Sequence, residues 1–427
     1  MPSVVTTDSD GLAFGGASLR KIACEFGTPF FVYDGDAIRC KVESLFSQFC
    51  YRPFRVHYSI KANPLVGLIT LLRDSGVSFD ACSRGDLAAA LAAGCNTDEI
   101  TFVGHGLDGR DYTVLEQARL RSIVADSEEQ IRRFARFPDL KSIGLRVNPL
   151  LDQNNPKLRS GSAQSRFGIP WQSVPDVARL VTSLGMRVEG LHAHIGSDIV
   201  DIEPYMETFE RLLAISRLND SIEWINVGGG YGFTDHLGGK EFNFGQLGES
   251  MASMLNQENV KRVRPLEIRV EPGGFLMMDA GLLVCEVVDA KLSGSDESPT
   301  RVVTTNTSSN HLMSAVVLGV EHPIWAETTG TRSEHEYVDI AGNLMHAGDV
   351  LARHRWLPRL EIGDLVAFGR SGAYTSSRST TFNGQGRPAE VLVLDGVPRL
   401  IRARETPEDL IRLDRAALAL ASPRADR

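Results

Sequence analysis

One lysine in this sequence stands where it could form a covalent bond with a carbonyl compound. Lys61 follows a β-type run at 57–60, and Asn63-Pro64 breaks the chain directly after it. A lysine amine held at such a strand end can form a Schiff base with an aldehyde. The plainer alternative is that Lys61 is a solvated residue closing an ordinary strand. The motifs farther along the chain favour the first interpretation.

Four further motifs lie at predicted strand ends or in loops, and they combine histidine, glycine, acidic and hydroxyl residues. In chain order they are GLHAHIGS at 190–197, NVGGGYG at 226–232, EPGG at 271–274 and SGAY at 371–374. Each has a plainer interpretation when taken singly. A triple glycine is often only a flexible turn, His194 could be a core histidine, and Glu271 could simply end a strand. The occurrence of all of them in order along one chain favours a common site.

The elements that would position these motifs follow a regular alternation of β-branched runs and helical stretches. We expect strands near 57–61, 77–83, 100–103, 122–126, 143–148, 188–196, 222–227 and 266–271. We expect helices between them, such as 65–72, 87–93, 128–137, 174–184 and 207–218. Eight strand–helix units predict a closed parallel (β/α)8 TIM barrel, in which chemistry occupies the carboxyl ends of the strands. Lys61, Asp80, His194, Gly228 and Glu271 all fall at such ends.

The pattern changes after residue 276 to short strands separated by turn signals, which predicts an antiparallel β-sandwich or β-barrel domain. We expect its strands near 281–291, 301–305, 336–340, 364–368, 390–394 and 399–403. The polar stretch 293–300 predicts a hairpin tip or loop, and we expect the tail from Asp414 to fray. The predicted fold is therefore α/β, with a barrel over 28–275 and a second, β domain from 276–427.

The composition is that of an ordinary globular protein that acts on small molecules. The chain has 427 residues, 42% of them hydrophobic and 23% charged, and this length exceeds what one core normally fills. A formal net charge of −9 and an isoelectric point near 5.7, with no basic run, disfavour a nucleic-acid surface. We therefore expect two domains and a small-molecule partner.

Neither cysteine usage nor hydropathy predicts a disulfide framework, a metal site or a membrane span. The six cysteines form no CxxC pair, so most are expected to be reduced core residues. The first residues have neither a basic start nor a long apolar run, and no stretch approaches the roughly 18 apolar residues of a membrane span. We expect a cytoplasmic protein without a bound metal.

Together the motifs resemble those of the pyridoxal-phosphate-dependent decarboxylases of the alanine-racemase fold type, the family of diaminopimelate and ornithine decarboxylases. The resemblance covers residues 28–405, and is closest to the diaminopimelate decarboxylases. It also includes FVYD at 31–34, FDACS at 79–83, RVNP at 146–149, RFG at 166–168 and RPAEV at 387–391. It implies that residues 1–27 join the C-terminal β domain, which contributes to the active site and to the interface of a homodimer with shared active sites.

A pyridoxal 5'-phosphate enzyme needs an amine that holds the cofactor, a grip on its phosphate, an acid for its pyridine nitrogen and a group against its ring. The resemblance assigns the amine to Lys61, the acid to Glu271 and the ring face to His194. Phosphate binding would use hydroxyls and backbone N–H groups, which glycine brings close to an anion. The remaining predicted cofactor-binding residues, for the phosphate and for the rest of the cofactor, are Asp80, Arg146, Ser197, Gly228, Gly229, Gly230, Gly273 and Tyr374.

The sequence departs from the family where the substrate would be held. Diaminopimelate decarboxylases continue the EPG motif with an arginine that holds the distal end of the substrate, and here this residue is Gly274. A second arginine and a tyrosine with related duties correspond to Ser314 and Leu318. In the family, each subunit of the dimer contributes a Cys-Glu pair to its neighbour's active site, and this pair corresponds to Met345-His346. A distal ammonium would lack a buried carboxylate partner, so diaminopimelate, lysine and ornithine are all poor candidates.

Polar residues near these positions could instead face an anionic or strongly polar distal group. The predicted substrate-binding residues are His311, Ser314, Met345, His346, Asp349 and Arg378. Arg378 could equally lie on the surface, whereas Gly274 and Ser314 would enlarge the pocket. We therefore expect a bulkier or acidic amino acid, free or on a carrier protein, of the kind that relatives handle in natural-product and siderophore pathways.

Three functions remain open at this point. The leading hypothesis is decarboxylation of an amino acid, with Lys61, His194 and His346 as the catalytic residues. Because Met345 carries no proton where relatives have a thiol, protonation could instead fall on the cofactor and release a carbonyl product. The third possibility is a non-catalytic homologue that binds a protein partner, against which the retention of Lys61 and Glu271 argues. A racemase is disfavoured because no two-base arrangement is evident.

Overall fold

The β-branched runs between residues 54 and 275 form eight parallel strands that close into a barrel. The architecture comes from a computed structural model that describes residues 5–8, 11–152, 154–232, 241–260, 262–295, 298–317, 319–330 and 332–421. The strands are β5 (Phe54–Ser59), β6 (Ser78–Ala81), β7 (Ile100–Val103), β8 (Ser122–Ala125), β9 (Ser142–Asn148), β11 (Arg187–His192), β12 (Trp224–Asn226) and β13 (Glu267–Val270). The order β9-β11-β12-β13-β5-β6-β7-β8 is closed by pairing of β8 with β9, so the predicted barrel is confirmed.

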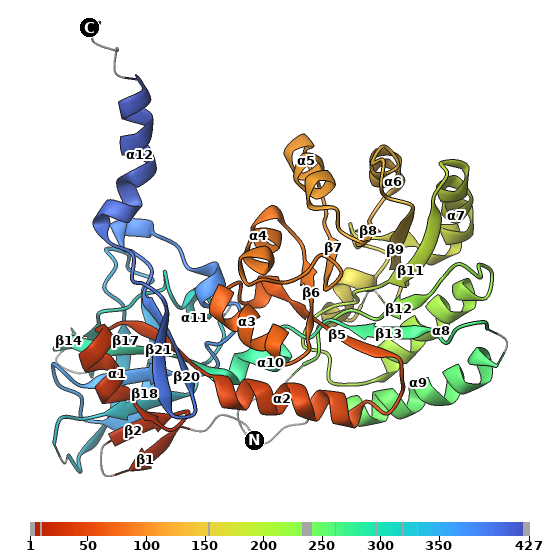
Figure 1. Ribbon diagram of the computed structural model, residues 1–427. Helices are drawn as coiled ribbons and strands as arrows, with labels where there is room; N and C mark the ends of the chain where they lie inside the picture. Colours follow the sequence, from red (N-terminus) through yellow and green to blue (C-terminus); the bar gives the residue numbers. More distant parts are fainter. Residues whose placement is uncertain are drawn as a thin grey trace, which may run out of the picture. The chain divides into compact units, whose positions relative to one another are not determined.

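Helices follow the strands and lie outside them (Figure 1). They are α3 (Val66–Asp74), α4 (Arg84–Ala92), α5 (Gly109–Ala118), α6 (Glu128–Phe134), α7 (Val174–Ser183), α8 (Glu203–Ser216) and α9 (Phe244–Asn259). Three of them begin at a capping side chain close after a strand. Ser83 accepts a hydrogen bond from Asp86 N, and Ser127 accepts one from Gln130 N. Asp108 forms a capping box that satisfies the first N–H groups of α5.

The chain divides into a barrel unit, Ile38–Met277, and a β unit formed by Met1–Ala37 with Met278–Arg427. The helix α2 (Gly35–Gln48) crosses the first division. The strand β4 (Phe30–Asp34), which fell inside the expected barrel range, pairs with β14 (Gly281–Ser295) and β20 (Ala389–Leu394) of the β unit. Its five residues are all buried, so a periodicity argument could not assign it to either sheet.

The main sheet of the β unit has the strand order β18-β17-β15-β14-β4-β20-β21, and β19 pairs with both β14 and β16. Its other strands are β15 (Ser298–Thr305), β16 (Ile324–Glu327), β17 (His335–Ala341), β18 (Val350–Pro358), β19 (Leu365–Phe368) and β21 (Val397–Arg402). A smaller antiparallel sheet contains β1 (Thr6–Asp8), β2 (Gly11–Phe14) and β3 (Ala17–Ser18). Two pairings in the main sheet, β15–β17 and β20–β4, are parallel, so the sheet is mixed rather than purely antiparallel.

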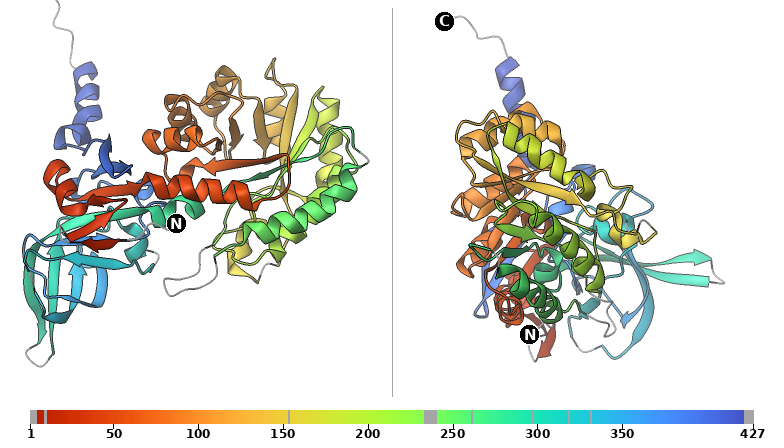
Figure 2. Two further views of the ribbon diagram at one scale, coloured as in Figure 1. Left: turned by 60° about the horizontal axis from the view of Figure 1, so that its bottom comes forward. Right: turned by 90° about the vertical axis from the view of Figure 1, so that its right-hand side faces the viewer.

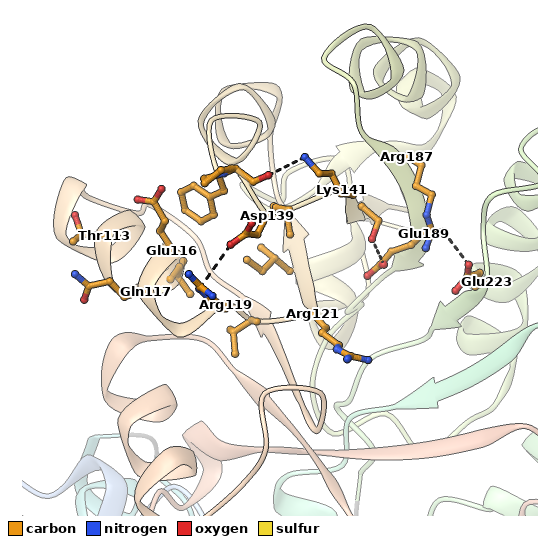
Figure 3. Close-up of a pocket in the computed structure, with 17 residues that line it drawn as sticks. Thr113, Glu116, Gln117, Arg119, Arg121, Asp139, Lys141, Arg187, Glu189 and Glu223 are labelled. Carbon is orange, nitrogen blue, oxygen red and sulfur yellow. Dashed lines mark hydrogen bonds and ion pairs between the residues drawn. The ribbon is translucent and has the colours of Figure 1, made fainter.

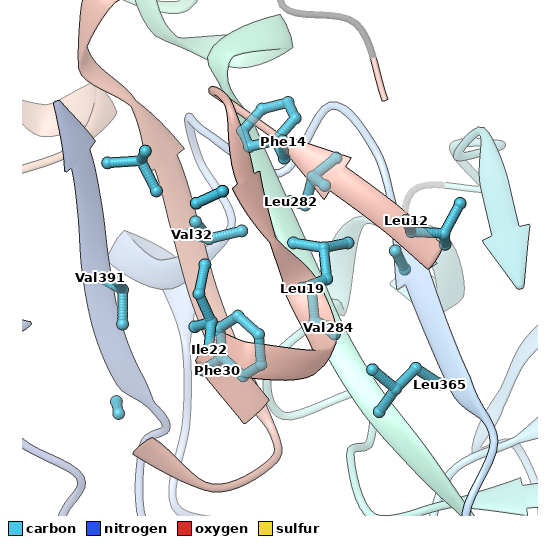
Figure 4. Close-up of a cluster of buried hydrophobic side chains, with 14 residues drawn as sticks. Leu12, Phe14, Leu19, Ile22, Phe30, Val32, Leu282, Val284, Leu365 and Val391 are labelled. Atoms are coloured by element: carbon cyan, nitrogen blue, oxygen red, sulfur yellow. The ribbon is translucent and has the colours of Figure 1, made fainter. Parts of the chain in front are cut away.

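One hydrophobic cluster joins the N-terminal residues to the sheet of the β unit (Figure 4). Leu19 and Ile22 of α1 (Leu19–Phe26) pack with Phe30 and Val32 of β4 and with Val284 of β14. These side chains are at most 1% exposed. Burial of each such side chain contributes roughly 1.5–3 kcal/mol, which explains why the N-terminal residues belong to this unit.

Of two expectations about the ends of elements, one is confirmed and one needs correction. The stretch 293–300 was expected to be a hairpin tip or loop, and β14 extends to Ser295 while β15 begins at Ser298, giving a long hairpin that projects from its sheet (Figure 2). The tail expected to fray from Asp414 is helical as far as Ala421, in α12 (Pro407–Ala421). Alanine and leucine after Asp414 have high helix propensity, which outweighs the lack of packing. No helix within the described residues is long and apolar enough to cross a membrane.

A tryptophan fills the interior of the barrel over two glycines. Gly144, Gly190 and Trp224 are in register across β9, β11 and β12. A Cβ on Gly190 would lie 2.0 Å from the Trp224 ring, and one on Gly144 would lie 2.7 Å from it. The two glycines therefore make room for the indole, which is 3% exposed.

We predict that Gly190→Ala destabilises the protein by roughly 1–3 kcal/mol, because the added methyl group overpacks the barrel interior. The measurement is urea unfolding followed by tryptophan fluorescence and circular dichroism. Gly109→Ala is the matched control, since its Cβ would meet nothing within 4 Å at an exposed first-turn position of α5. Equal stability of the two variants would contradict the packing argument.

Candidate functional site

Lys61 lies just beyond the carboxyl end of β5, in a 3-10 turn, η1 (Ile60–Ala62). Ile60 and Ala62 are buried and anchor the turn, whereas Lys61 is exposed. The turn is held by the Tyr58 hydroxyl, which donates to the Asn63 carbonyl at 3.1 Å. The sequence therefore presents one amine at the mouth of the barrel on a rigid support, as expected.

Asp80 and Cys82 lie beside this lysine, at the end of β6. The Cys82 sulfur is 3.8 Å from Lys61 Nζ and 3.6 Å from Asp80 Oδ2. Ser59 donates to the same Asp80 oxygen at 3.0 Å. Burial and the nearby Glu271 carboxylate raise the pKa of Asp80, while burial and Asp80 raise the pKa of the Cys82 thiol. Cys82 is therefore a protonated thiol at neutral pH.

Glu271 follows β13 and is held by two donors. Asn226 Nδ2 donates to its Oε1 at 2.7 Å, and His192 Nε2 lies 3.2 Å from its Oε2. Burial alone would raise the pKa of Glu271, but His192, which also forms a hydrogen bond with it, and Lys61 hold this pKa below its ordinary value. An ionised carboxylate is thus maintained in a place from which water is largely excluded.

His194 and the glycine run form a tightly packed loop next to this carboxylate. Gly229 N–H donates to His194 Nδ1 at 3.3 Å. Burial, with Lys61 and Arg146 as positive neighbours, lowers the pKa of His194 well below its usual value, so the ring is neutral and Nδ1 can accept. A Cβ on Gly229 would lie 2.1 Å from the Glu271 carbonyl oxygen, which excludes any other residue there.

The loop also offers groups that could bind an anion. Gly230 has a φ of +91°, and a Cβ on it would lie 2.0 Å from the Gly196 carbonyl oxygen. Among the described residues, neither Gly230 N–H nor the exposed Ser197 hydroxyl has a hydrogen-bond partner. Backbone N–H groups in such a glycine turn form an anion-binding concavity.

Arg146 and Gly273 complete the predicted barrel residues. Arg146 Nε lies 3.7 Å from Asp126 Oδ1, and its guanidinium is 4.5 Å from the centre of the Phe167 ring. Its charge reaches His194, as shown by its effect on the pKa of that ring. Gly273 immediately precedes the short helix α10 (Gly274–Met277) and accepts a hydrogen bond from Leu276 N at 3.2 Å.

These residues fit pyridoxal phosphate on three structural grounds. An amine stands at the barrel mouth for the aldehyde, and a glycine loop with available donors suits the phosphate. An ionised, buried carboxylate suits a protonated pyridine nitrogen. Lys61, Ser197, Gly230 and Glu271 would hold the cofactor at these three points, with His194 against its ring. No group of three or more His, Cys, Asp or Glu side chains among the described residues could hold a metal ion.

Two predicted residues of the β unit form a contact with each other. The Arg378 guanidinium lies 5.1 Å from the centre of the Tyr374 ring. Tyr374 has a φ of +57°, so a hydroxyl-bearing ring is presented from a backbone conformation that side chains rarely adopt. Such strain persists where the surroundings require a particular orientation, which is common at binding sites.

Three predicted substrate-binding residues have structural partners inside the β unit. Asp349 accepts backbone hydrogen bonds from Ser309 N at 2.7 Å and Leu344 N at 2.9 Å, so it fixes the loop that carries Met345. His311 is buried, its Nδ1 lies 3.0 Å from Thr307 Oγ1, and burial lowers its pKa to about 4. The hydroxyl of Ser314 lies 2.8 Å from His322 Nε2.

The other predicted residues of the β unit are on its surface. Met345 is 90% exposed, and His346 is also exposed. Arg378 is exposed as well, which matches the surface alternative considered from the sequence. Leu318 lies outside the described residues.

Sequence reasoning missed four barrel residues that the structure places around the predicted ones: Ser59, Cys82, His192 and Asn226. The available signal was the period of two in a strand, which puts Cys82 on the side of Asp80 and His192 on the side of His194. The hydrogen-bond partners themselves carry no sequence signal, because β12 and β13 are separated by a helix.

A hollow of about 810 Å³ lies at the opposite end of the barrel, at the starts of β8, β9 and β11 (Figure 3). Two ion pairs lie among its charged side chains. Arg187 Nη1 is 2.9 Å from Glu223 Oε1, and Arg119 Nε is 3.7 Å from Asp139 Oδ2. No predicted site residue lines it. The predicted barrel residues lie instead at the carboxyl end of the strands.

Comparison with known proteins gives a consistent result. Residues 36–278 match the family model of the pyridoxal-dependent decarboxylase, pyridoxal binding domain. The diaminopimelate decarboxylase of Methanothermobacter thermautotrophicus is 32% identical over 422 residues, covering 96% of this chain and 97% of that protein. The enzyme of the same name from Deinococcus radiodurans is 31% identical, covering 92% and 97%. The crystal structure of diaminopimelate decarboxylase from M. jannaschii with L-lysine has a TM-score of 0.87 at 26% identity, covering 96% and 97%.

We predict that His57, in the barrel interior, makes the protein acid-labile. Burial and the nearby Arg269 lower the pKa of His57 from 6.5 to about 3. The unfolded chain therefore takes up a proton first as the pH falls, and stability is lost between about pH 6.5 and pH 3. This effect amounts to about 2 kcal/mol between pH 7.5 and pH 5. Urea unfolding of wild type and His57→Gln at both pH values should show that the variant loses less stability; equal losses would contradict the assignment.

Proposed function

The chain belongs to the pyridoxal-dependent decarboxylase family and is a carboxy-lyase that uses pyridoxal phosphate, and we propose that it holds this cofactor on Lys61 and acts on an amino acid other than diaminopimelate. The observation that carries the cofactor assignment is the combination of one amine at the barrel mouth with the ionised Glu271 behind it. The substrate assignment rests on the residues that replace the family's clamp for the distal end of diaminopimelate.

When bound, pyridoxal phosphate supplies an electron sink for the electron pair left on Cα as carbon dioxide departs. Glu271 would keep a proton on the pyridine nitrogen, because its own pKa is depressed. Neutral His194 would lie against the ring without adding charge. Gly230 N–H and the Ser197 hydroxyl would bind the phosphate, and Arg146 would keep the surroundings positive.

Protonation at Cα needs a donor close to Lys61. Met345 cannot serve, because a thioether has no proton to give. The candidate donors are Lys61 itself, the exposed His346 and water, and the thiol of Cys82 lies 3.8 Å from Lys61 Nζ. Where no donor reaches Cα, protonation on the cofactor would give a carbonyl product. This second outcome is favoured by the loss of the family's thiol at Met345.

The distal part of the substrate would meet small or uncharged residues in place of the family's charged clamp. Gly274 and Ser314 take the places of two arginines, and Met345-His346 takes the place of Cys-Glu. Three losses of charge remove partners for both a distal carboxylate and a distal ammonium. We propose a bulkier or acidic amino acid, free or carrier-bound, from a natural-product or siderophore pathway.

Diaminopimelate decarboxylation is the second candidate. It is favoured by relatives of that name at 32% and 31% identity over more than nine-tenths of the chain. At this level of identity the chemistry of the cofactor is shared, whereas the distal contacts can change. The four substituted positions therefore weigh more than the shared name.

We also propose a homodimer in which the β unit of one subunit completes the site of the other. The support is the loop Gly342–Asp349, which presents Met345 with 90% of its side chain exposed while Asp349 fixes its shape. The family resemblance assigns this loop to the neighbouring site.

Borohydride reduction of the protein with bound pyridoxal phosphate tests the cofactor assignment. We expect the label on the peptide that contains Lys61 and a loss of labelling in Lys61→Ala. Lys41→Ala is the control, because Lys41 belongs to the same barrel unit but pairs with Glu241 at 2.9 Å. Recovery of the label on another lysine would refute the proposal.

A panel of amino acids tested for carbon dioxide release separates the two substrate candidates. Each lost charged hydrogen bond costs about 1.5–3 kcal/mol, so two or three losses slow diaminopimelate, lysine and ornithine by roughly two to six orders of magnitude. Gly274→Arg with His346→Glu should raise the rate with diaminopimelate. Efficient turnover of diaminopimelate by the unchanged protein would establish the second candidate. Analysis of the same reactions for amine and carbonyl products identifies the site of protonation.

Mixing two inactive variants tests the shared site. Lys61→Ala removes the amine, and Asp349→Ala releases the loop that carries Met345. After subunit exchange, heterodimers contain one intact site, so an equal mixture should regain about a quarter of wild-type activity. No recovery, despite exchange proven by a mass tag, would count against shared sites.

A further inference from the structure

We propose that Asn226 and His192 are positioning residues that keep Glu271 ionised and directed at the pyridine nitrogen of the cofactor, and that Asn226 ties this carboxylate to the phosphate-binding loop. The inference rests on the proposed function, because it assumes that the cofactor binds at Lys61. It concerns residues that neither the family motifs nor the comparisons assign to any role.

The contacts of Glu271 leave a lone pair available on each carboxylate oxygen. The carboxylate is 4% exposed and accepts one hydrogen bond at each oxygen, from Asn226 at 2.7 Å and His192 at 3.2 Å. Each carboxylate oxygen has two lone pairs, so each can accept again. Both donors are at most 1% exposed, so neither can be replaced by bulk water. The remaining lone pairs define where a protonated ring nitrogen could bind.

The side-chain amide of Asn226 is held in one of its two orientations. Its Oδ1 accepts a hydrogen bond from Gly228 N at 2.8 Å, so its Nδ2 must face Glu271. Glu271 N–H in turn donates to the Gly228 carbonyl at 2.7 Å. Asn226, Gly228 and Glu271 thus form a closed set of hydrogen bonds between β12 and β13. A shift of the glycine loop on phosphate binding would be felt directly at the carboxylate.

His192 acts as a hydrogen-bond donor to Glu271 in this arrangement. Its Nδ1 is buried and has no hydrogen-bond partner within the described part of the chain. A buried N–H without an acceptor is costly, so the proton belongs on Nε2, where it can be donated to Glu271. The ring is therefore fixed in the tautomer that supports an anionic carboxylate.

The two donors also decide which of two neighbouring carboxyl groups carries a proton. Glu271 and Asp80 interact closely enough that the charge of Glu271 contributes to the raised pKa of Asp80. Ser59 and Cys82, which are uncharged, donate to Asp80, and the charge of Lys61 lowers its pKa. Without Asn226 and His192, the proton could pass to Glu271, which would then no longer hold a proton on the ring nitrogen.

The test compares the affinity of apoenzyme for pyridoxal phosphate with its affinity for the 1-deaza analogue, which lacks the ring nitrogen. Wild type should prefer pyridoxal phosphate by roughly ten- to a hundredfold, the value of one charged hydrogen bond. Asn226→Asp is nearly isosteric and keeps the acceptor for Gly228 N–H, but it replaces the donor with a second carboxylate. We expect this variant and His192→Phe to lose most of the preference, and His192→Gln, which restores a donor, to keep it.

Tyr231→Phe is the matched control, because the Tyr231 hydroxyl donates to the Gly228 carbonyl at 2.8 Å without touching Glu271. It should weaken both ligands equally and leave their ratio unchanged. If His192→Phe does not fold, Asn226→Asp decides alone. An undiminished preference in Asn226→Asp, or no preference in wild type, overturns the inference. Failure of wild type to bind pyridoxal phosphate, or labelling of a lysine other than Lys61, overturns the proposed function instead.

Discussion

The buried negative charge of Glu271 is the constraint on which the rest of the site depends. An ionised carboxylate inside a barrel is costly unless donors surround it, and here Asn226 and His192 provide them. Once this charge is fixed, its neighbours must adjust. Asp80 tends to keep its proton, and His194 stays neutral between Lys61 and Arg146. The charge of Glu271 thus contributes to the raised pKa of Asp80, while burial, Lys61 and Arg146 keep His194 neutral.

Glycine is what allows these groups to come so close together. The run Gly228–Gly230 passes within van der Waals distance of the backbone at Gly196 and Glu271, where a Cβ would lie only 2.0–2.1 Å from a carbonyl oxygen. The same packing requirement recurs deeper in the barrel, where Gly190 makes room for Trp224. Close backbone approach at the top and a filled interior below keep the strand ends in a fixed register.

The period of the sequence predicted the eight barrel strands and the strand-end positions of Lys61, Asp80, His194 and Glu271, because burial of alternate residues is a local signal. It could not predict which side chains bond across strands, as with Asn226 and Glu271, which are 45 residues apart. Nor could it show that the Asp349 carboxylate would accept hydrogen bonds from Ser309 N and Leu344 N. Polar residues in a motif can serve the loop or a ligand equally well, and only the contacts distinguish the two.

The groups whose protonation matters in the barrel have hydrogen-bond partners within the barrel unit. Asp80 forms hydrogen bonds with Ser59 and Cys82, and His194 forms one with Gly229. Glu271 forms hydrogen bonds with His192 and Asn226. All of these residues belong to the unit Ile38–Met277. Substitutions on the loop that carries Met345 and His346 leave these bonds untouched. A chain can therefore keep the cofactor chemistry of its family while the residues that meet the distal end of the substrate diverge. Whole-length similarity to diaminopimelate decarboxylases is therefore compatible with the substrate that we propose.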